Sequence, residues 1–182
     1  MPSPSSRQGY ASVTSPLLEA SQQPCVSVTS PATESLGDLA VALAAAYKLD
    51  ADPWQEYVLG HWLAVGDNGW ANMTCGLAVP RQNGKNAILE IRELFGTIGR
   101  GEKILHTAHE VKTAQKHFLR LKHFFGECAN DPSAKFPDLN ALVASIRNVN
   151  GQEAVYLKNG GSIEIELEPK SFCVNLPAKT GG

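Results

Sequence analysis

The sequence Ala-Val-Pro-Arg-Gln-Asn-Gly-Lys-Asn at residues 78–86 decides the predicted fold of this chain. It follows an apolar run at residues 73–79 and precedes apolar residues at helical spacing in residues 87–95. A strand, a tight polar turn ending in Gly-Lys and a helix together predict a phosphate-binding loop. The first N–H groups of a helix have no partner within the helix, and the helix dipole adds partial positive charge there. The ammonium of Lys85 adds a full charge for the β- and γ-phosphates of a nucleotide.

The stretch departs from the usual phosphate-loop pattern, G-x-x-x-x-G-K-[ST], at two positions. Val79 stands at the first Gly position, and Asn86 stands where Ser or Thr ligates Mg²⁺. Gly84 lets the backbone approach the phosphates because it lacks a Cβ. The amide oxygen of Asn86 offers Mg²⁺ a weak ligand, directly or through water. The alternative interpretation is a polar turn that only caps a helix.

Length and composition bound the class of protein. A chain of 182 residues predicts one domain, or one domain plus a tail. The net charge of −2 argues against a strongly basic coat for nucleic acid. The four cysteines include no C-x-x-C pair, so they favour reduced thiols in the cytosol over a disulfide framework or a zinc site. Cys75 and Cys173 lie in apolar stretches and are predicted to be buried.

Targeting and membrane signals are not found in the sequence. The N-terminus lacks a positive region followed by an apolar one, so no secretory signal is predicted. The longest apolar run, residues 39–47, is too short to cross a bilayer.

Residues 1–33 are rich in Ser, Pro and Gln and are predicted to form a disordered tail, with an ordered domain at 34–182.

Local signals predict where single elements begin. Asp52 and Pro53 predict an N-cap and a first helical position. Thr107 and Glu110 have the spacing of a capping box, and the Asn-Gly sequence inside 158–161 predicts a β-hairpin. The predicted helices are at 34–48, 52–63 and 85–95, and a further helix follows Thr107. The predicted strands are at 70–79, 103–106, 154–157 and 162–168, and a loop is predicted at 129–137. The apolar face of the helix after Thr107 consists of Val111, Ala114, Phe118, Leu121 and Phe125.

This order of elements predicts an α/β fold. The expected architecture is an incomplete parallel sheet core of the P-loop NTPase type with a C-terminal antiparallel β-hairpin. No internal repeat is recognisable.

Taken together, these segments resemble the N-terminal ATPase portion of the terminase large subunit of tailed bacteriophages, the DNA-packaging motor. Trp54-Gln55 resembles the Gln motif of that family on the adenine side, and residues 80–85 resemble its deviant phosphate loop, with an Arg three positions before the Gly. Residues 104–110 resemble its next strand and helix, and residues 172–182 resemble the segment before its acidic strand. The resemblance covers roughly residues 45–182.

The resemblance implies ATP and Mg²⁺ as cofactors. The residues assigned to the nucleotide are Trp54, Gln55, Pro80, Arg81, Gln82, Asn83, Gly84, Lys85 and Asn86. Lys85 and Arg81 are also assigned the catalytic stabilisation of phosphate charge, because an ammonium and a planar guanidinium suit phosphate oxygens. The Gln55 amide can donate and accept in one plane, as an adenine edge requires. For Trp54 the alternative is packing in the core.

The resemblance also implies partners and a location. The partners are double-stranded DNA, the portal, the small terminase subunit and other copies of the chain, in the cytoplasm of the bacterial host and not at a membrane. The family pattern continues with an acidic Walker B strand, a coupling motif and a nuclease domain, which are not found after the loop in this sequence. The chain is therefore expected to be truncated before the acidic strand and to hydrolyse little ATP by itself.

Other interpretations remain open at this point. The same motifs fit another P-loop ATPase of the helicase type, or a non-catalytic interaction module with a vestigial loop. A stripe on the predicted helix after Thr107 fits either contact with a DNA backbone or an ordinary solvated face; its members are His109, Lys112, Lys116, Arg120 and His123. His106, Thr107 and His109 are better explained by capping and loop polarity than by a metal, because no further ligand lies nearby in the sequence.

Overall fold

The computed structural model describes residues 24–67, 69–80, 82–149 and 152–166. They form a mixed α/β protein, and the chain divides into two compact units between Phe95 and Gly96. Residues 24–32 form neither helix nor strand and are exposed. Thr33, the last residue of the predicted tail, donates its backbone N–H to the carbonyl of Val65 at 2.9 Å, and residues 1–23 lie outside the described residues.

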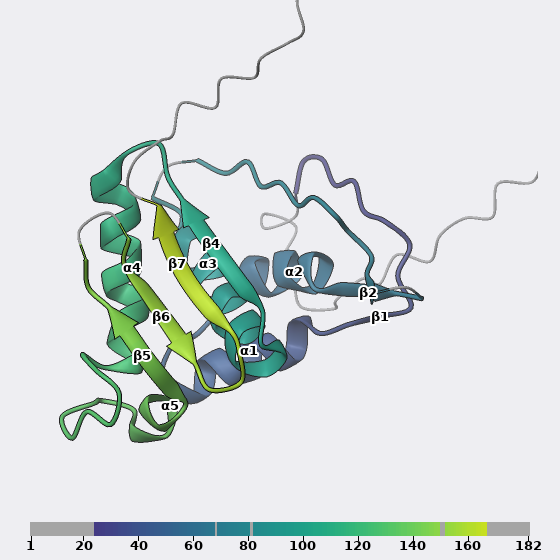
Figure 1. The fold of residues 1–182 in the computed structure, drawn as a ribbon. Helices are drawn as coiled ribbons and strands as arrows, with labels where there is room; N and C mark the ends of the chain where they lie inside the picture. Colours follow the sequence, from purple (N-terminus) through teal and green to yellow (C-terminus); the bar gives the residue numbers. More distant parts are fainter. Residues whose placement is uncertain (1–23, 68, 81, 150–151, 167–182) are drawn as a thin grey trace, which may run out of the picture. The chain divides into compact units, whose positions relative to one another are not determined.

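The first unit is built on three helices: α1 (Gly37–Ala46), α2 (Pro53–Trp62) and α3 (Lys85–Leu94) (Figure 1). The apolar core between them consists of Ala40, Ala44, Leu59, Leu63, Ile88, Ile91 and Phe95. The backbones of α1 and α2 approach closely at Gly37, where an added Cβ would lie 2.6 Å from the Cα of Gly60. Helix spacing in the sequence therefore identified the core-forming residues of α3 correctly.

A small antiparallel sheet completes this unit. Its strands are β1 (Glu34–Ser35), β2 (Ala64–Gly66) and β3 (Gly69–Trp70), in the order β1-β2-β3. The helix predicted from residue 34 thus begins at Gly37, because Glu34 and Ser35 pair with Val65 and Ala64.

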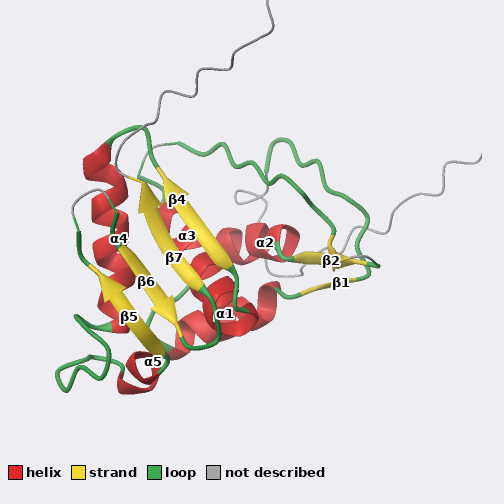
Figure 2. Cartoon of the chain, viewed as in Figure 1, coloured by secondary structure: helices red, strands yellow, loops and turns green. Residues whose placement is uncertain are grey.

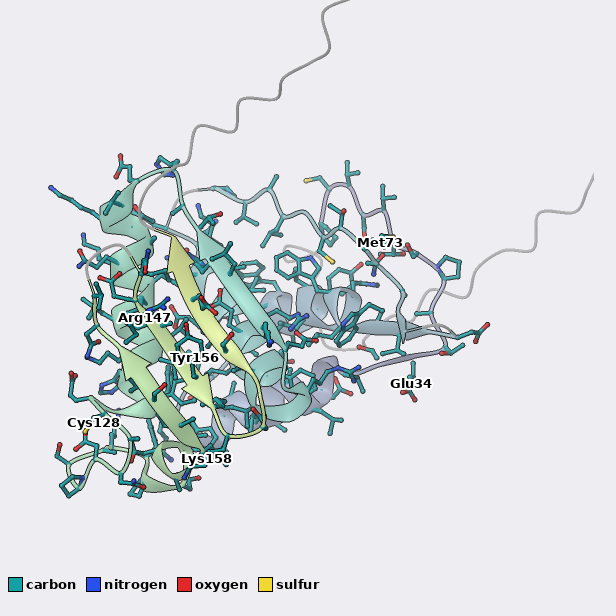
Figure 3. All side chains as sticks on the ribbon, in the orientation of Figure 1. Glu34, Met73, Cys128, Arg147, Tyr156 and Lys158 are labelled. Carbon is teal, nitrogen blue, oxygen red and sulfur yellow. The ribbon has the colours of Figure 1, made fainter. Side chains whose placement is uncertain are left out.

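The strand predicted at residues 70–79 is wrong. Only Trp70 belongs to a strand, and residues 71–80 form neither helix nor strand (Figure 2). Met73 is fully exposed, and its side chain is labelled in Figure 3. An apolar run becomes a strand only where a neighbour pairs with it, and the described residues provide no such neighbour. Cys75 is exposed, so its predicted burial is also wrong; Cys173 lies outside the described residues.

The second unit contains a four-stranded mixed sheet with α4 (Val111–Phe125) against one face (Figure 1). The strands are β4 (Lys103–Thr107), β5 (Val143–Arg147), β6 (Ala154–Leu157) and β7 (Ser162–Glu166), in the order β4-β7-β6-β5. Only β4 and β7 are parallel; β6 is antiparallel to both of its neighbours. The described residues therefore form a mixed sheet with a single parallel pair.

The predicted β-hairpin is confirmed in β6 and β7. Its turn is held by Asn159, whose side-chain amide donates to the carbonyls of Thr97 (2.9 Å) and Ile98 (3.0 Å). The side-chain Oδ1 of Asn159 accepts the N–H of Gly161 at 2.9 Å. Thr97 and Ile98 belong to a π-helical turn, η2 (Phe95–Gly99), which follows α3. Asn159 therefore stabilises the hairpin turn itself and also the contact of this turn with η2.

The predicted capping box at Thr107 is wrong. Thr107 is the last residue of β4 and pairs with Glu166, so its backbone stays extended, and α4 begins at Val111 after Glu110. The predicted apolar face of this helix is otherwise correct, because four of its five members are buried and only Val111 is exposed.

In the second unit, neither β5 nor a short helix, α5 (Pro137–Ala141), was predicted. The loop before α5 is organised by Asn140, which donates to the carbonyls of Phe125 (2.6 Å) and Cys128 (2.7 Å) and accepts the N–H of Asp131 at 2.8 Å. On the outer face of the sheet, Arg147 lies over the ring of Tyr156, 5.7 Å from its centroid (Figure 3). Among the described residues, no helix is long and apolar enough to cross a membrane.

The Asp131 carboxylate gives a testable pH dependence. Hydrogen bonds from the Ser133 hydroxyl (2.6 Å) and from the N–H groups of Glu127 and Ser133 lower its pKa below the ordinary 3.8. A carboxyl whose pKa is lowered by folding stabilises the native state above its unfolded pKa, and this stabilisation is lost as the pH falls through the folded pKa. Asp131→Asn should therefore lower the melting temperature at pH 7, and the difference from wild type should shrink below about pH 4.

The measurement is thermal unfolding followed by circular dichroism between pH 7 and pH 2. Asp67→Asn, at an exposed turn position, is the control. A difference between Asp131→Asn and wild type that stays constant across this range would contradict the assigned hydrogen bonds.

Candidate functional site

The described part of the predicted phosphate loop turns sharply at Gln82 and Asn83. Gln82 and Gly84 both have left-handed backbones, with φ of 66° and 70°, while Asn83 between them does not. Residues 82–86 are all exposed. Turns with left-handed residues direct backbone N–H groups toward one side, which favours the approach of an anion. A left-handed conformation costs a residue with a side chain about 1–2 kcal/mol, which Gln82 bears here.

The loop leads directly into α3. Gly84 is the N-cap, its carbonyl accepts the N–H of Ala87 at 3.0 Å, and Lys85 is the first helical residue. The N–H groups of Lys85 and Asn86 belong to the first turn, where a helix offers them no carbonyl. Lys85, which is exposed, and these N–H groups therefore lie at the positive end of the α3 dipole.

Gln55 is brought to this loop from 29 positions away in the sequence. Its side chain is buried, and its Nε2 donates to the carbonyl of Gly84 at 3.0 Å. Its Oε1 accepts the N–H of Asp52 at 2.8 Å, which caps α2. The sequence signal for the cap was Asp52-Pro53; the contact with Gly84 had no sequence signal.

The other residues that were predicted to bind the nucleotide differ in their exposure. Trp54 is half-buried and packs against the apolar core of α1, α2 and α3, which is the alternative given for it. Pro80 is exposed at the end of the loop before the turn. Arg81 lies outside the described residues.

Arg92, on α3, lies beside Trp70 and Cys75 of the segment that precedes the loop. The Arg92 guanidinium lies over the ring of Trp70, 5.2 Å from its centroid. Partial burial of the Cys75 thiol raises its pKa, and the nearby Arg92 charge opposes this rise. A thiol with a raised pKa holds less of the nucleophilic thiolate, so Cys75 does not have the environment of a catalytic cysteine.

The histidines of the second unit are arranged differently from the sequence prediction. His109 is exposed and lies 3.9 Å from a carboxylate oxygen of Glu110. His106, on β4, stacks on His117, with ring centroids 3.8 Å apart. His117 is buried on α4 one turn after Ala114, so helical spacing from the apolar residues was the signal that identifies it.

The predicted basic stripe lies on the exposed side of α4. Its members there are Lys112, Lys116, Arg120 and His123. No Asp or Glu occurs between Val111 and Phe125. Successive cations four residues apart rise about 6 Å along the helix. The Nζ of Lys135 lies 3.2 Å from the Nε2 of His123 and extends the stripe beyond the helix.

Comparison with known proteins identified no relative of this chain. Searches against protein-family models, curated proteins and solved structures each found no match to this chain.

The left-handed conformation of Gly84 gives a prediction about the loop. An added Cβ at Gly84 would lie 2.9 Å from the Nε2 of Gln55, on a backbone with φ of 70°. Gly84→Ala should therefore lower the free energy of unfolding by about 1–2 kcal/mol from the backbone conformation alone. Urea unfolding followed by circular dichroism measures this loss. Gly76→Ala is the matched control, because no atom lies within 4 Å of its added Cβ; equal effects of the two changes would contradict the loop conformation.

Proposed function

We propose that residues 80–86 bind the phosphates of ATP and that this chain is the ATP-binding N-terminal part of a phage terminase large subunit. In the complete motor, ATP hydrolysis drives double-stranded DNA into a procapsid in the cytoplasm of the bacterial host. The partners of that motor are the portal, the small terminase subunit and further copies of the chain. An incomplete P-loop NTPase core is part of the same proposal.

One observation carries the proposal. Gly84, in a left-handed conformation, ends a compact exposed turn, and Lys85 begins a ten-residue helix immediately after it. This arrangement supplies backbone N–H groups, a helix dipole and an ammonium at one place, which are the three features that stabilise a bound phosphate.

Each loop residue has a chemical role in the proposal. Lys85 neutralises charge on the β- and γ-phosphates, and Arg81 adds a second cation. The side-chain oxygen of Asn86 is the candidate ligand for Mg²⁺, directly or through a water molecule. Mg²⁺ held by Asn86 would supply positive charge that offsets the negative charge of the phosphates.

Two alternatives to the terminase assignment follow from the same residues. A helicase-like ATPase would bind nucleotide by the same loop and would differ in its partners. An interaction module with a vestigial loop would not bind nucleotide, so millimolar Mg-ATP would leave its melting temperature unchanged.

Lys85→Ala tests the loop directly. Hydrogen bonds to charged groups contribute about 1.5–3 kcal/mol each, so we expect the affinity for Mg-ATP to fall roughly 10- to 150-fold. Isothermal titration calorimetry measures this change. Lys103→Ala removes the same charge from an exposed position on β4 and is the control. Equal affinities of wild type and Lys85→Ala would exclude the phosphate role of Lys85.

The DNA part of the proposal is supported by the exposed side of α4. The cations are regularly spaced, and no carboxylate interrupts them within the helix. Neutralising phosphates releases counterions, so binding at such a surface depends steeply on salt.

A double substitution tests this surface. Lys112→Ala with Lys116→Ala should weaken binding to duplex DNA and reduce the slope of log affinity against log salt by about 1.8, the value for two phosphate contacts. Fluorescence anisotropy between 50 and 200 mM salt, roughly the range in which such slopes are resolved, measures both quantities. With Lys103→Ala as control, an unchanged slope would show that the α4 stripe is a solvated face.

A further inference from the structure

Gln55 is a buried polar residue at the start of an otherwise accessible helix turn. It is 3% exposed, whereas Asp52, Pro53 and Glu56 around it are exposed. A buried amide is stable only when its donors and acceptor are engaged, so its partners identify what it holds.

Both ends of the Gln55 amide are engaged with backbone groups. The Oε1 accepts the N–H of Asp52, and the Nε2 donates to the carbonyl of Gly84. One side chain therefore links the N-terminus of α2 to the N-terminus of α3.

The Gly84 carbonyl and the Lys85 N–H belong to the same peptide unit. That unit is planar and trans, so the carbonyl and the N–H point in opposite directions. A hydrogen bond that holds the carbonyl toward Gln55 therefore directs the Lys85 N–H away from Gln55. This N–H belongs to the first turn of α3, where an anion is bound by helix N–H groups.

We propose that Gln55 is a positioning residue of the phosphate loop and does not read the nucleotide base. Its amide fixes the Gly84–Lys85 peptide in the orientation that presents the Lys85 N–H to a phosphate. The inference rests on the proposed function, because it concerns how the same loop binds its ligand. It differs from the adenine role implied by the family resemblance, since recognition of a base edge requires an accessible amide.

The two roles predict different ligand dependence. A positioning residue acts on every ligand that has the phosphates, whereas a base-reading residue acts only on adenine nucleotides. Gln55→Glu keeps the acceptor for the Asp52 N–H and replaces the donor that faces the Gly84 carbonyl. We expect it to weaken Mg-ATP, Mg-GTP and magnesium tripolyphosphate by the same factor, at least about 2- to 10-fold, the effect of one hydrogen bond.

Calorimetric titration of the wild type, Gln55→Glu and Gln55→Met with the three ligands tests this expectation. Gln55→Met keeps the side-chain length and removes the amide, and Gln115→Glu at an exposed position on α4 is the matched control. Equal weakening for all three ligands supports positioning. Weakening of Mg-ATP alone, or no change with any ligand, would overturn it.

A second measurement separates this inference from the proposed function. The Gly84 carbonyl also accepts the N–H of Ala87, so loss of the Gln55 bond should raise hydrogen exchange at Ala87 in the ligand-free protein. Unchanged exchange at Ala87 in both Gln55 variants would overturn the inference even if nucleotide binds. A wild-type chain that binds none of the three ligands would overturn the proposed function and the phosphate role of Gln55 together.

Discussion

The carbonyl of Gly84 is the group on which the candidate site depends. It accepts a hydrogen bond from Gln55 and another from Ala87, so it is shared by the cap of α2 and the first turn of α3. Gly84 reaches this position through a left-handed backbone, which a residue with a Cβ adopts only at a cost. The direction of the Lys85 N–H follows from the planarity of the peptide. A backbone conformation, more than any side-chain cluster, therefore underlies the anion binding that is proposed for the loop.

Local signals in the sequence predicted the parts of the fold that depend on neighbouring residues. Asp52-Pro53 predicted the start of α2, because capping and a fixed proline φ act within one turn. The Asn-Gly sequence predicted the β6–β7 hairpin for a similar reason. The apolar spacing in α3 and α4 predicted which sides of these helices are buried.

Three of the failures involve partners that are distant in the sequence. The apolar run after Trp70 has strand-like composition, but composition does not provide a neighbouring strand. Thr107 has the spacing of a capping residue, but its pairing with Glu166 in the sheet takes precedence. Within the candidate site, Lys85 and Gly84 were identifiable from a motif, whereas the contact of Gln55 with Gly84 joins residues 29 positions apart.

The loss of the predicted strand changes how the loop is supported. In a phosphate loop between a strand and a helix, both ends of the turn are fixed by regular structure. Here α3 fixes the end at Lys85, while residues 71–80 before the turn are neither helix nor strand. Ordering a backbone residue costs roughly 1–2 kcal/mol, and the side before the turn has no regular structure to offset this cost. Gln55 adds support from α2 only at the α3 end, because its bond reaches Gly84, the residue at which the turn becomes a helix. The turn is therefore held at its α3 end by the helix and by the Gln55 amide, whereas the more regular form of the motif is held at both ends.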